Sequence, residues 1–433
     1  MRHPPGLGYI VGNEAAERFS YYGMKSILVV FMTTQLVTRG GISDSMSPSE
    51  ATFWYHIFTM GNYLFPLVGA LLADVVWGKY PTIIWLSLVY CLGHFVLALD
   101  STRLGLLVGL SLIAIGAGGI KPCVSAHLGD QYRGEQTARI SEGYSLFYIA
   151  INMGAFASSL LIPWLLEAYG AHVAFGVPGI FMALATVVFW LGRHRYQRIP
   201  PTRWSDYVHD LMQPAKRRAL RHLALIFVLV AAFWALFDQM GSSWVLQAER
   251  MDRTIMLPLL GEMTILASQI QAINPLLILI LTPTFAWWLY PWCERRGLLS
   301  LVGRIVVGMI LAGVAFGIVA LAQYWLVQNI HVSIGWQVLA YVVLTVSEVM
   351  VSVTTLELTY THSPRVSKSF VTSFYLLSIA LGNGVAALYN GCLAGVLGGP
   401  ETVSYFTFFA ALPVIASLGA WTVLRTLRAE WQQ

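Results

Sequence analysis

Long apolar segments recur along this chain and are separated by short polar ones. Two of them, "YPTIIWLSLVYCLGHFVLAL" and "VAFGVPGIFMALATVVFWLG", have the twenty or so residues that a helix needs to cross a bilayer. The pattern predicts an all-α membrane protein. We expect twelve transmembrane helices, near residues 8–37, 50–73, 80–99, 103–128, 142–167, 170–192, 220–247, 270–292, 299–326, 333–358, 367–397 and 402–425.

A polar stretch after the sixth predicted helix divides the chain into two halves. This stretch, "RHRYQRIPPTRWSDYVHDLMQPAKRRALRH", contains a Pro-Pro pair and mixed charge, which indicate a cytoplasmic linker, with room for a short interfacial helix. We therefore expect six-helix bundles at residues 1–193 and 220–433, joined by a linker at 194–219. Two six-helix halves are the architecture of major facilitator transporters, which bind substrate between the halves.

The distribution of lysine and arginine predicts the orientation in the membrane. With a cytoplasmic N-terminus, nineteen basic residues fall in cytoplasmic segments, and four fall on the opposite side. These four are Arg39, Arg103, Arg250 and Arg253. Cytoplasmic loops are enriched in basic residues, so both termini are expected to be cytoplasmic, and the net charge of +5 does not indicate nucleic acid binding.

Composition agrees with a membrane protein, because 57% of the residues are hydrophobic and only 11% are charged. No cleavable signal peptide is expected, since no separate short apolar core precedes a cleavage site. The four cysteines are scattered without metal-ligand spacing, so we expect buried free thiols, no metal and no cofactor. They are Cys91, Cys123, Cys293 and Cys392.

The first predicted helix carries an unusual cluster of charges. At about 100° per residue, Glu14, Glu17, Arg18, Tyr21 and Lys25 lie on one stripe about 100° wide, and from Glu14 to Lys25 the helix rises about 17 Å, to mid-membrane. Charges facing lipid are expensive, so the stripe is expected to face a bundle interior or a watery cavity. A structural ion-pair network is one interpretation. Proton exchange suits two acids beside one arginine better, because small rearrangements can switch their protonation.

Four segments resemble known signatures. "NEAAERFSYYGMK" is similar to the ExxERFxYYG signature of the proton-dependent oligopeptide transporter family, and "FYIAINMGA" is similar to the family's FYxxINxG. "GAGGIKPCVSAHLGDQY" resembles the family's fourth helix, and "GALLADVVWGKY" resembles the superfamily's loop between helices two and three. The resemblance runs from helix 1 through helix 11.

This resemblance implies a bacterial member of the family, a multi-pass protein of the inner (plasma) membrane. It would import di- and tripeptides with protons by alternating access, as a symporter of the major facilitator superfamily. Its expected partners are peptide, protons and the lipid bilayer, and it is expected to be a monomer. A transporter of another small anionic or zwitterionic metabolite, such as nitrate, is the alternative. An enzyme is not expected, because no nucleophile–base or metal constellation is present, and a channel would need a continuous polar stripe.

The ends of a short peptide call for opposite charges in its site. Lys25 and Lys121 can form a cationic pole for the carboxylate, although a lysine that snorkels to the interface is the alternative for Lys121. Glu348 is alone in an apolar helix and is the natural partner of the ammonium, because a buried unpaired carboxylate is costly. A purely structural role is the alternative for Glu348.

Asn152 and Asn274 can satisfy the peptide amides, because each side chain donates and accepts. Asn274 precedes Pro275, so a kink or capping role is its alternative. The resemblance implies that both asparagines contact substrate. The expected pocket walls, for which packing is the alternative, are Tyr21, Tyr22, Tyr63, Trp234, Phe374 and Ser378.

The resemblance also implies a carboxylate at Asp238, one turn beyond Trp234 in helix 7, that pairs with the cation of helix 1. It suggests two bridges, Lys25–Asp238 and Lys121–Glu348, which protonation or substrate would make or break. His56 matches a histidine of animal members and has a possible proton role, since histidine titrates near neutrality. A packed, hydrogen-bonded histidine is the alternative.

Several positions depart from the family's pattern. Lys25 replaces a common arginine, which removes the bidentate clamp that a guanidinium offers to a carboxylate. Asp238 is shorter than the glutamate of many bacterial members, and Phe374 replaces a common tryptophan. The linker is too short for the extra membrane hairpin of many bacterial members.

Overall fold

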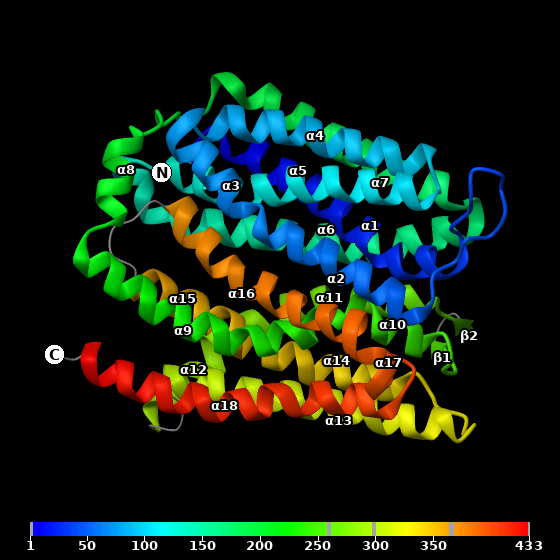
Figure 1. The fold of residues 1–433 in the computed structure, drawn as a ribbon. Coiled ribbons are helices and arrows are strands. Elements are labelled where there is room, and N and C mark those ends of the chain that lie inside the picture. The colour runs from blue at the N-terminus through cyan, green and yellow to red at the C-terminus, as the bar shows by residue number, and fades with distance from the viewer. Residues whose placement is uncertain (1–2, 258–260, 297–299, 363–367, 432–433) are drawn as a thin grey trace. The chain divides into compact units, whose positions relative to one another are not determined.

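The computed structural model describes residues 3–257, 261–296, 300–362 and 368–431. Within them the chain is almost entirely helical (Figure 1). One short hairpin, in which β1 (Thr254–Leu257) pairs antiparallel with β2 (Gly261–Thr264), was not predicted from the sequence. Arg2 and Arg365 lie outside the described residues. Both belong to the nineteen basic residues that the sequence places in cytoplasmic segments.

The chain folds into two compact units. Unit 1 comprises residues 1–45, 58–217 and 364–377, and unit 2 comprises residues 46–57, 218–363 and 378–433. Helices α2 (Pro48–Leu64) and α16 (Lys368–Leu388) contribute residues to both units.

Unit 1 is built from long helices joined by short connections. Its further elements in chain order are α1 (Leu7–Thr34), α3 (Pro66–Leu71), η1 (Leu72–Val76), α4 (Lys79–Leu99), α5 (Arg103–Asp130), η2 (Gly134–Arg139), α6 (Ile140–Tyr169), α7 (Ala171–Leu191), η3 (Gly192–His194) and α8 (Trp204–Leu211). The short helix α8 lies in the predicted linker, where the sequence left room for one.

Unit 2 has more interrupted helices. Its elements are most of α9 (Pro214–Phe237), η4 (Asp238–Gly241), α10 (Ser243–Ala248), the hairpin, η5 (Ala267–Ala272), α11 (Ile273–Thr284), η6 (Phe285–Leu289), α12 (Tyr290–Arg295), α13 (Leu301–Val327), α14 (Gly335–Glu348), η7 (Val349–Val353), α15 (Thr354–His362), η8 (Tyr389–Leu393), α17 (Ala394–Leu397) and α18 (Val403–Trp431). Four of the short segments (η1, η6, η7 and η8) are π-helical turns, a geometry frequent at functional sites.

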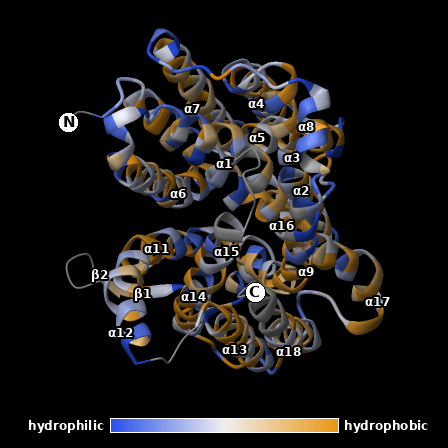
Figure 2. Ribbon diagram, turned by 90° about the vertical axis from the view of Figure 1, so that its left-hand side faces the viewer, coloured by the Kyte–Doolittle hydropathy of each residue, from blue (hydrophilic) through white to orange (hydrophobic). Residues whose placement is uncertain are grey.

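Each of the twelve predicted spans corresponds to a helical segment of the structure. In the described part of the chain, eleven helices are long and apolar enough to cross a membrane. The twelfth, α1, has 28 residues and is long enough, but it carries the four charged residues of the opening cluster. Hydrophobic residues, orange in Figure 2, make up much of the helices in both units.

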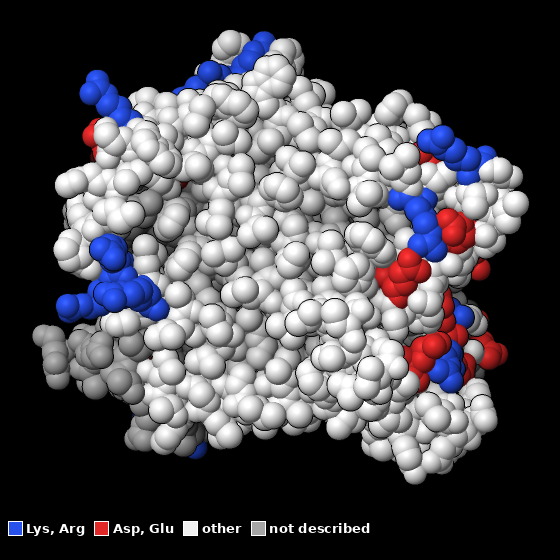
Figure 3. All heavy atoms as spheres, in the orientation of Figure 1, with Lys and Arg blue, Asp and Glu red and all other residues white. Residues whose placement is uncertain are grey.

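Charged side chains gather at the ends of the helices. In the face shown in Figure 3, lysine, arginine, aspartate and glutamate lie toward the two ends and along the upper edge, and the broad surface between them is nearly uncharged. Such a band is what lipid-facing helices require, because a charge that faces hydrocarbon is expensive.

The cysteines follow the sequence prediction only in part. All four are free, and Cys123 and Cys293 are buried. Cys392 is exposed, which corrects the expectation of buried thiols, because its π-helical turn η8 turns this side chain outward. Among the described residues no group of three His, Cys, Asp or Glu side chains could hold a metal ion.

Candidate functional site

The charged stripe of α1 faces the interior of unit 1. Glu14, Glu17, Arg18 and Lys25 are all buried, with at most 7% of each residue exposed. Arg18 Nε lies 3.2 Å from Glu14 Oε1 and also donates to Glu17 Oε2. One guanidinium therefore holds two carboxylates on successive turns of a helix. Protonation of either carboxylate weakens its ion pair with Arg18, so protonation can change the arrangement of the cluster.

A second cation lies over two aromatic rings next to this cluster. Lys121 Nζ of α5 is 4.4 Å from the ring centroid of Tyr21 and 4.0 Å from that of Tyr63. Asn62 fixes Tyr21 by donating a 2.8 Å hydrogen bond to its hydroxyl. The rings stabilise the ammonium through cation–π attraction without neutralising it. Lys121 is therefore a half-buried positive charge that suits a carboxylate.

The other predicted residues of unit 1 lie on three helices. Lys25 Nζ is 6.0 Å from the Tyr21 ring, and Tyr22 packs edge-on against Tyr21 with ring centroids 5.3 Å apart. Asn152 of α6 is buried and donates from Nδ2 to the carbonyl of Tyr148, so its Oδ1 remains to accept from a ligand. Phe374 of α16 is half-buried and stacks on Phe370.

Two glycines explain why the sequence signatures contain glycine where they do. A Cβ on Gly154 of α6 would lie 2.5 Å from the carbonyl oxygen of Ala15, and a Cβ on Gly23 of α1 would lie 2.7 Å from Ile162 of α6. Only glycine allows backbones to approach this closely. The two signature segments thus pack on each other, which fixes the height of the charged stripe against α6.

In unit 2, Asp238 belongs to a hydrogen-bonded group of polar side chains. Asn383 Nδ2 of α16 donates to Asp238 Oδ2 at 2.7 Å, and Asn383 Oδ1 lies 2.7 Å from His56 Nδ1 of α2. His56 Nε2 lies 3.1 Å from Ser242 Oγ. Because the asparagine oxygen must accept, His56 carries its proton on Nδ1, and Nε2 accepts from Ser242 when the ring is neutral. On protonation Nε2 would donate to the same hydroxyl, so the group can hold either form of the histidine.

The position of Asp238 differs from the prediction in one respect. The sequence indicated a continuous helix through residue 247, but α9 ends at Phe237, and Asp238 begins the 3₁₀ turn η4. A second helix, α10, starts at Ser243. The break brings Gly241 against the hydroxyl of Tyr55, where a Cβ would approach to 2.0 Å. Asp238 therefore lies at a helix interruption.

Glu348 occupies a comparable interruption in unit 2. It is the last residue of α14, immediately before the π-helical turn η7, and it is half-buried. Asn274 Nδ2 of α11 donates to Glu348 Oε2 at 2.8 Å and lies 3.1 Å from Thr345 Oγ1. Asn274 is in the first turn of α11, but its amide donates to residues of α14 and does not cap its own helix.

The two remaining predicted pocket residues of unit 2 are buried. Trp234 of α9 packs edge-on against Phe237, with ring centroids 5.3 Å apart, and its Nε1 has no hydrogen-bond partner among the described residues. Ser378 of α16 is fully buried. A tryptophan N–H usually finds a partner when buried, and the contact of Trp234 with substrate stays a prediction.

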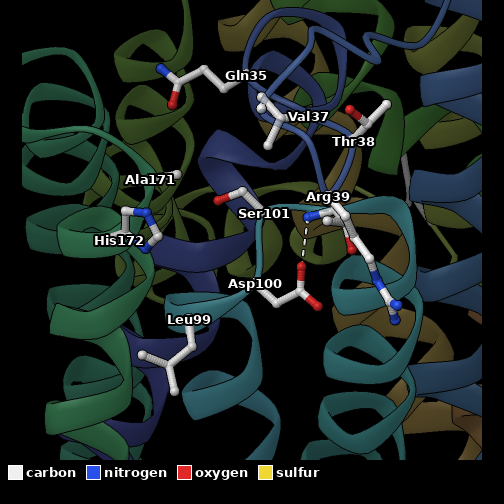
Figure 4. A pocket seen from close by; sticks show the side chains of 11 residues that line it. Gln35, Val37, Thr38, Arg39, Leu99, Asp100, Ser101, Ala171 and His172 are labelled. Carbon is white, nitrogen blue, oxygen red and sulfur yellow. Dashed lines mark hydrogen bonds between the residues drawn. The ribbon is translucent and has the colours of Figure 1, made fainter.

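Unit 1 also contains an open pocket at one end of its helices. It has a volume of about 550 Å³ and lies where α1 and α4 end and α7 begins (Figure 4). Hydrogen bonds from Thr102 hold the pKa of its Asp100 below the usual value, so this carboxylate is already satisfied. None of the residues predicted to bind substrate or protons lines it. The lining residues are Gln35, Val37, Thr38, Arg39, Gly41, Leu99, Asp100, Ser101, Thr102, Ala171 and His172.

Comparison with known proteins identifies the family. Residues 80–210 and 203–396 match the POT family. The chain belongs to the POT family. It is 36% identical over 74% of its length to "Peptide transporter 3" of Caenorhabditis elegans, 51% of which is covered. It is 36% identical, also over 74% of its length, to "Solute carrier family 15 member 2" of Homo sapiens, 49% of which is covered. The chain thus spans about half the length of these curated relatives.

Solved structures of POT family members cover nearly the whole chain. A crystal structure of the POT family transporter PepTSo is 32% identical, covers 99% of this chain and 99% of that one, and superposes with a TM-score of 0.89. An auto-inhibited POT family peptide transporter is 34% identical with a TM-score of 0.86, covering 98% of this chain and 97% of that one. The twelve-helix major facilitator fold predicted from the sequence is therefore confirmed.

For this POT family member, the predicted site residues divide between the two units. Unit 1 holds Glu14, Glu17, Arg18, Tyr21, Tyr22, Lys25, Tyr63, Lys121, Asn152 and Phe374, and unit 2 holds His56, Trp234, Asp238, Asn274, Glu348 and Ser378. The bridges Lys25–Asp238 and Lys121–Glu348 each join one unit to the other. They stay predictions.

Sequence reasoning missed three polar residues that hold the predicted ones. Asn62 donates a hydrogen bond to Tyr21. Asn383 connects Asp238 to His56. Thr345 accepts a hydrogen bond from Asn274, which also donates to Glu348. Asn62 and Asn383 are single amides in apolar helices, in "TMGNYLF" and "SIALGNGVAAL". That isolation was the signal that could have identified them, because a polar side chain inside a membrane helix usually has a partner.

Proposed function

We propose that this protein imports di- and tripeptides with protons, as a symporter that works by alternating access. The observation that carries the proposal is the buried arrangement of Glu14 and Glu17 around Arg18 on a membrane helix. Two acids that share one cation can take up a proton and release it when the helix environment changes. Membership of the POT family supports the same reaction.

The proposed substrate site recognises the groups that all short peptides share, which are the carboxylate, the ammonium and the amides. Lys121, held by Tyr21 and Tyr63, would attract the carboxylate, with Lys25 as a second positive charge. Glu348 would attract the ammonium. Asn152 and Asn274 would satisfy the amide groups, and the aromatic residues and Ser378 would contact the variable side chains.

Proton coupling would join these groups to the change of access. In this proposal the pairs Lys25–Asp238 and Lys121–Glu348 form and break in different states, driven by protonation and by the ends of the substrate. His56 would pass or hold a proton next to Asp238 through Asn383. We further propose a monomer of the bacterial plasma membrane, with both termini cytoplasmic, as the charge distribution indicates.

Uptake of labelled dialanine into proteoliposomes under an imposed pH gradient, inside alkaline, tests the proposal. We expect accumulation that collapses when a protonophore dissipates the gradient. Glu17→Gln should abolish this driven uptake and leave peptide counterflow at least partly intact, because counterflow needs no net proton movement. If wild type accumulates nitrate and ignores peptides, the substrate assignment is wrong and the alternative is correct.

A further inference from the structure

A buried group of polar side chains lies between α1 and α4 in unit 1, next to the residues proposed to carry the proton. Ser20, Tyr90 and His94 are each 0% exposed. Ser20 Oγ lies 2.8 Å from His94 Nε2, and the rings of Tyr90 and His94 stack with centroids 5.0 Å apart. Three fully buried polar residues in an apolar bundle need a physical explanation.

Three atoms of this region are buried and have no hydrogen-bond partner among the described residues. They are Glu17 Oε1, the Tyr90 hydroxyl and His94 Nδ1. Glu17 and Ser20 lie one turn apart on the same side of α1. Tyr90 stacks on His94, which Ser20 contacts, so the Tyr90 ring lies beside the side of α1 that carries Ser20 and Glu17. A carboxylate oxygen without a donor and a hydroxyl without a partner are therefore both buried in this region of unit 1.

The unpartnered atoms determine the direction of the hydrogen bonds. A buried N–H without an acceptor is worse than a nitrogen lone pair without a donor. His94 therefore carries its proton on Nε2 and donates to Ser20 Oγ, which leaves only a lone pair at Nδ1. The Ser20 proton is then available to Tyr90, and the Tyr90 proton points away from Ser20. Two buried acceptors have no donor, His94 Nδ1 and Glu17 Oε1, and the charged carboxylate is the stronger of the two.

We propose that His94, Ser20 and Tyr90 form a directed hydrogen-bond chain that ends at Glu17 Oε1 through one buried water molecule, and that this chain stabilises the ionised form of Glu17. The three side chains are positioning residues for the proton-carrying carboxylate. Arg18 satisfies one oxygen of Glu17, and the chain satisfies the other. This inference rests on the proposed proton symport.

The charged and titratable groups around Glu17 are few. On α1 they are Glu14, Arg18 and the adjacent tyrosines, and on α4 they are Tyr90, Cys91 and His94. From α5, Lys121 acts on Glu14. The segment of α6 between Tyr148 and Glu167 contains no titratable side chain, and α7 contains only His172 in its first turn. Tyr90 is therefore a neutral donor that can distinguish the two protonation states of Glu17.

The first test removes a single hydroxyl. Tyr90→Phe should extend proton-driven dialanine uptake to higher pH, because loss of a donor to the ionised carboxylate favours its protonated form. We expect the pH of half-maximal uptake to rise by about one unit, which is about a tenfold change in proton affinity. Tyr196→Phe is the matched control, since the buried Tyr196 hydroxyl in the same unit donates to the carbonyl of Phe189. It should keep the wild-type pH profile.

Further variants separate positioning from packing. Ser20→Ala and His94→Leu interrupt the chain and should shift the profile in the same direction as Tyr90→Phe. His94→Gln keeps a donor at the end of the side chain and should restore the wild-type profile. A merely structural His94 would give the opposite order, because leucine packs into an apolar bundle better than glutamine.

A measurement without transport completes the test. At fixed pH, the infrared band of protonated carboxyl groups should be stronger in Tyr90→Phe than in wild type, and Glu17→Gln should remove this difference. If wild type accumulates dialanine and Tyr90→Phe keeps both the wild-type pH profile and the wild-type band, the hydrogen-bond chain is wrong and the symport proposal stands. If wild type accumulates no peptide under the gradient, the symport proposal itself is wrong.

Discussion

The side-chain amide of Asn383 donates a 2.7 Å hydrogen bond to the carboxylate of Asp238. The oxygen of the same amide lies 2.7 Å from His56 Nδ1, so one residue of α16 connects a histidine of α2 to an aspartate at the end of α9. An asparagine can do this in only one orientation, because it has a single donor side and a single acceptor side. The orientation of His56 therefore depends on the aspartate.

We predict that Asn383→Ala uncouples uptake from the proton gradient. The change leaves Asp238 and His56 without the amide between them, and hydrogen bonds to charged groups are worth about 1.5–3 kcal/mol. Proton-driven dialanine uptake should fall about tenfold or more, and counterflow should fall much less. Asn390→Ala is the control, two turns further along α16 into η8, since Asn390 donates to the Ala386 carbonyl and to Tyr405. Equal losses in the two variants would mean that Asn383 only supports the bundle.

Gly154→Ala should destabilise the protein by about 1–3 kcal/mol, as overpacking of a tight interface does. The added Cβ would lie 2.5 Å from the carbonyl oxygen of Ala15, so α1 and α6 must separate. Gly317→Ala in α13 is the control, because a Cβ there meets no atom within 4 Å. It should be neutral or stabilising by up to about 1 kcal/mol. Thermal unfolding in detergent measures both variants, and a neutral Gly154→Ala would show that the helices are not held at this distance.

Hydrophobic periodicity was sufficient to predict the twelve helices, because a membrane span requires about twenty apolar residues and little else is compatible with such a run. The same reasoning located the charged stripe of α1, since charges inside a span must face inward. Periodicity could not predict the breaks beside Asp238 and Glu348. A 3₁₀ or π-helical turn changes the hydrogen-bond pattern without changing which residues are apolar.

The hydrogen-bond partners of the site residues could not be predicted from the sequence either. Asn62 and Asn383 are far along the chain from the side chains that they hold, and their pairing depends on how the helices pack. The hairpin of β1 and β2 was also not predicted. It lies in the polar connection between a predicted span that ends at residue 247 and one that begins near residue 270. Neither periodicity nor charge marks the short strands between them.

Lys121 should distinguish peptides by the charge of their C-terminus. Its ammonium lies over two aromatic rings, at 4.0 and 4.4 Å from their centroids, and keeps its positive charge there. Dialanine amide, which lacks that carboxylate, should bind wild type much more weakly than dialanine. Lys121→Ala should lose most of its affinity for dialanine and lose little for the amide. Competition against labelled dialanine measures the affinities of both proteins for both ligands. Equal affinity of wild type for dialanine and its amide would mean that Lys121 does not attract the carboxylate.

Glu348 should read the opposite end of the substrate. Its carboxylate accepts a hydrogen bond from Asn274 at 2.8 Å, and this partner is neutral, so the negative charge is held in place without being cancelled by it. A peptide ammonium can use that charge, whereas an N-acetylated peptide cannot.

Glu348→Gln keeps the size and hydrogen-bonding capacity of the side chain and removes its charge. Binding of free peptides should weaken about tenfold or more, as expected when a charge-assisted hydrogen bond is lost, and binding of N-acetylated peptides should change little. Glu357→Gln in α15 is the matched control, since Glu357 lies 3.8 Å from Arg304, with its side chain 47% exposed, and has no assigned contact with substrate. It should affect both ligands equally. A uniform loss for both ligands in Glu348→Gln would instead mean that Glu348 stabilises the junction of α14 and η7 and does not discriminate between substrates.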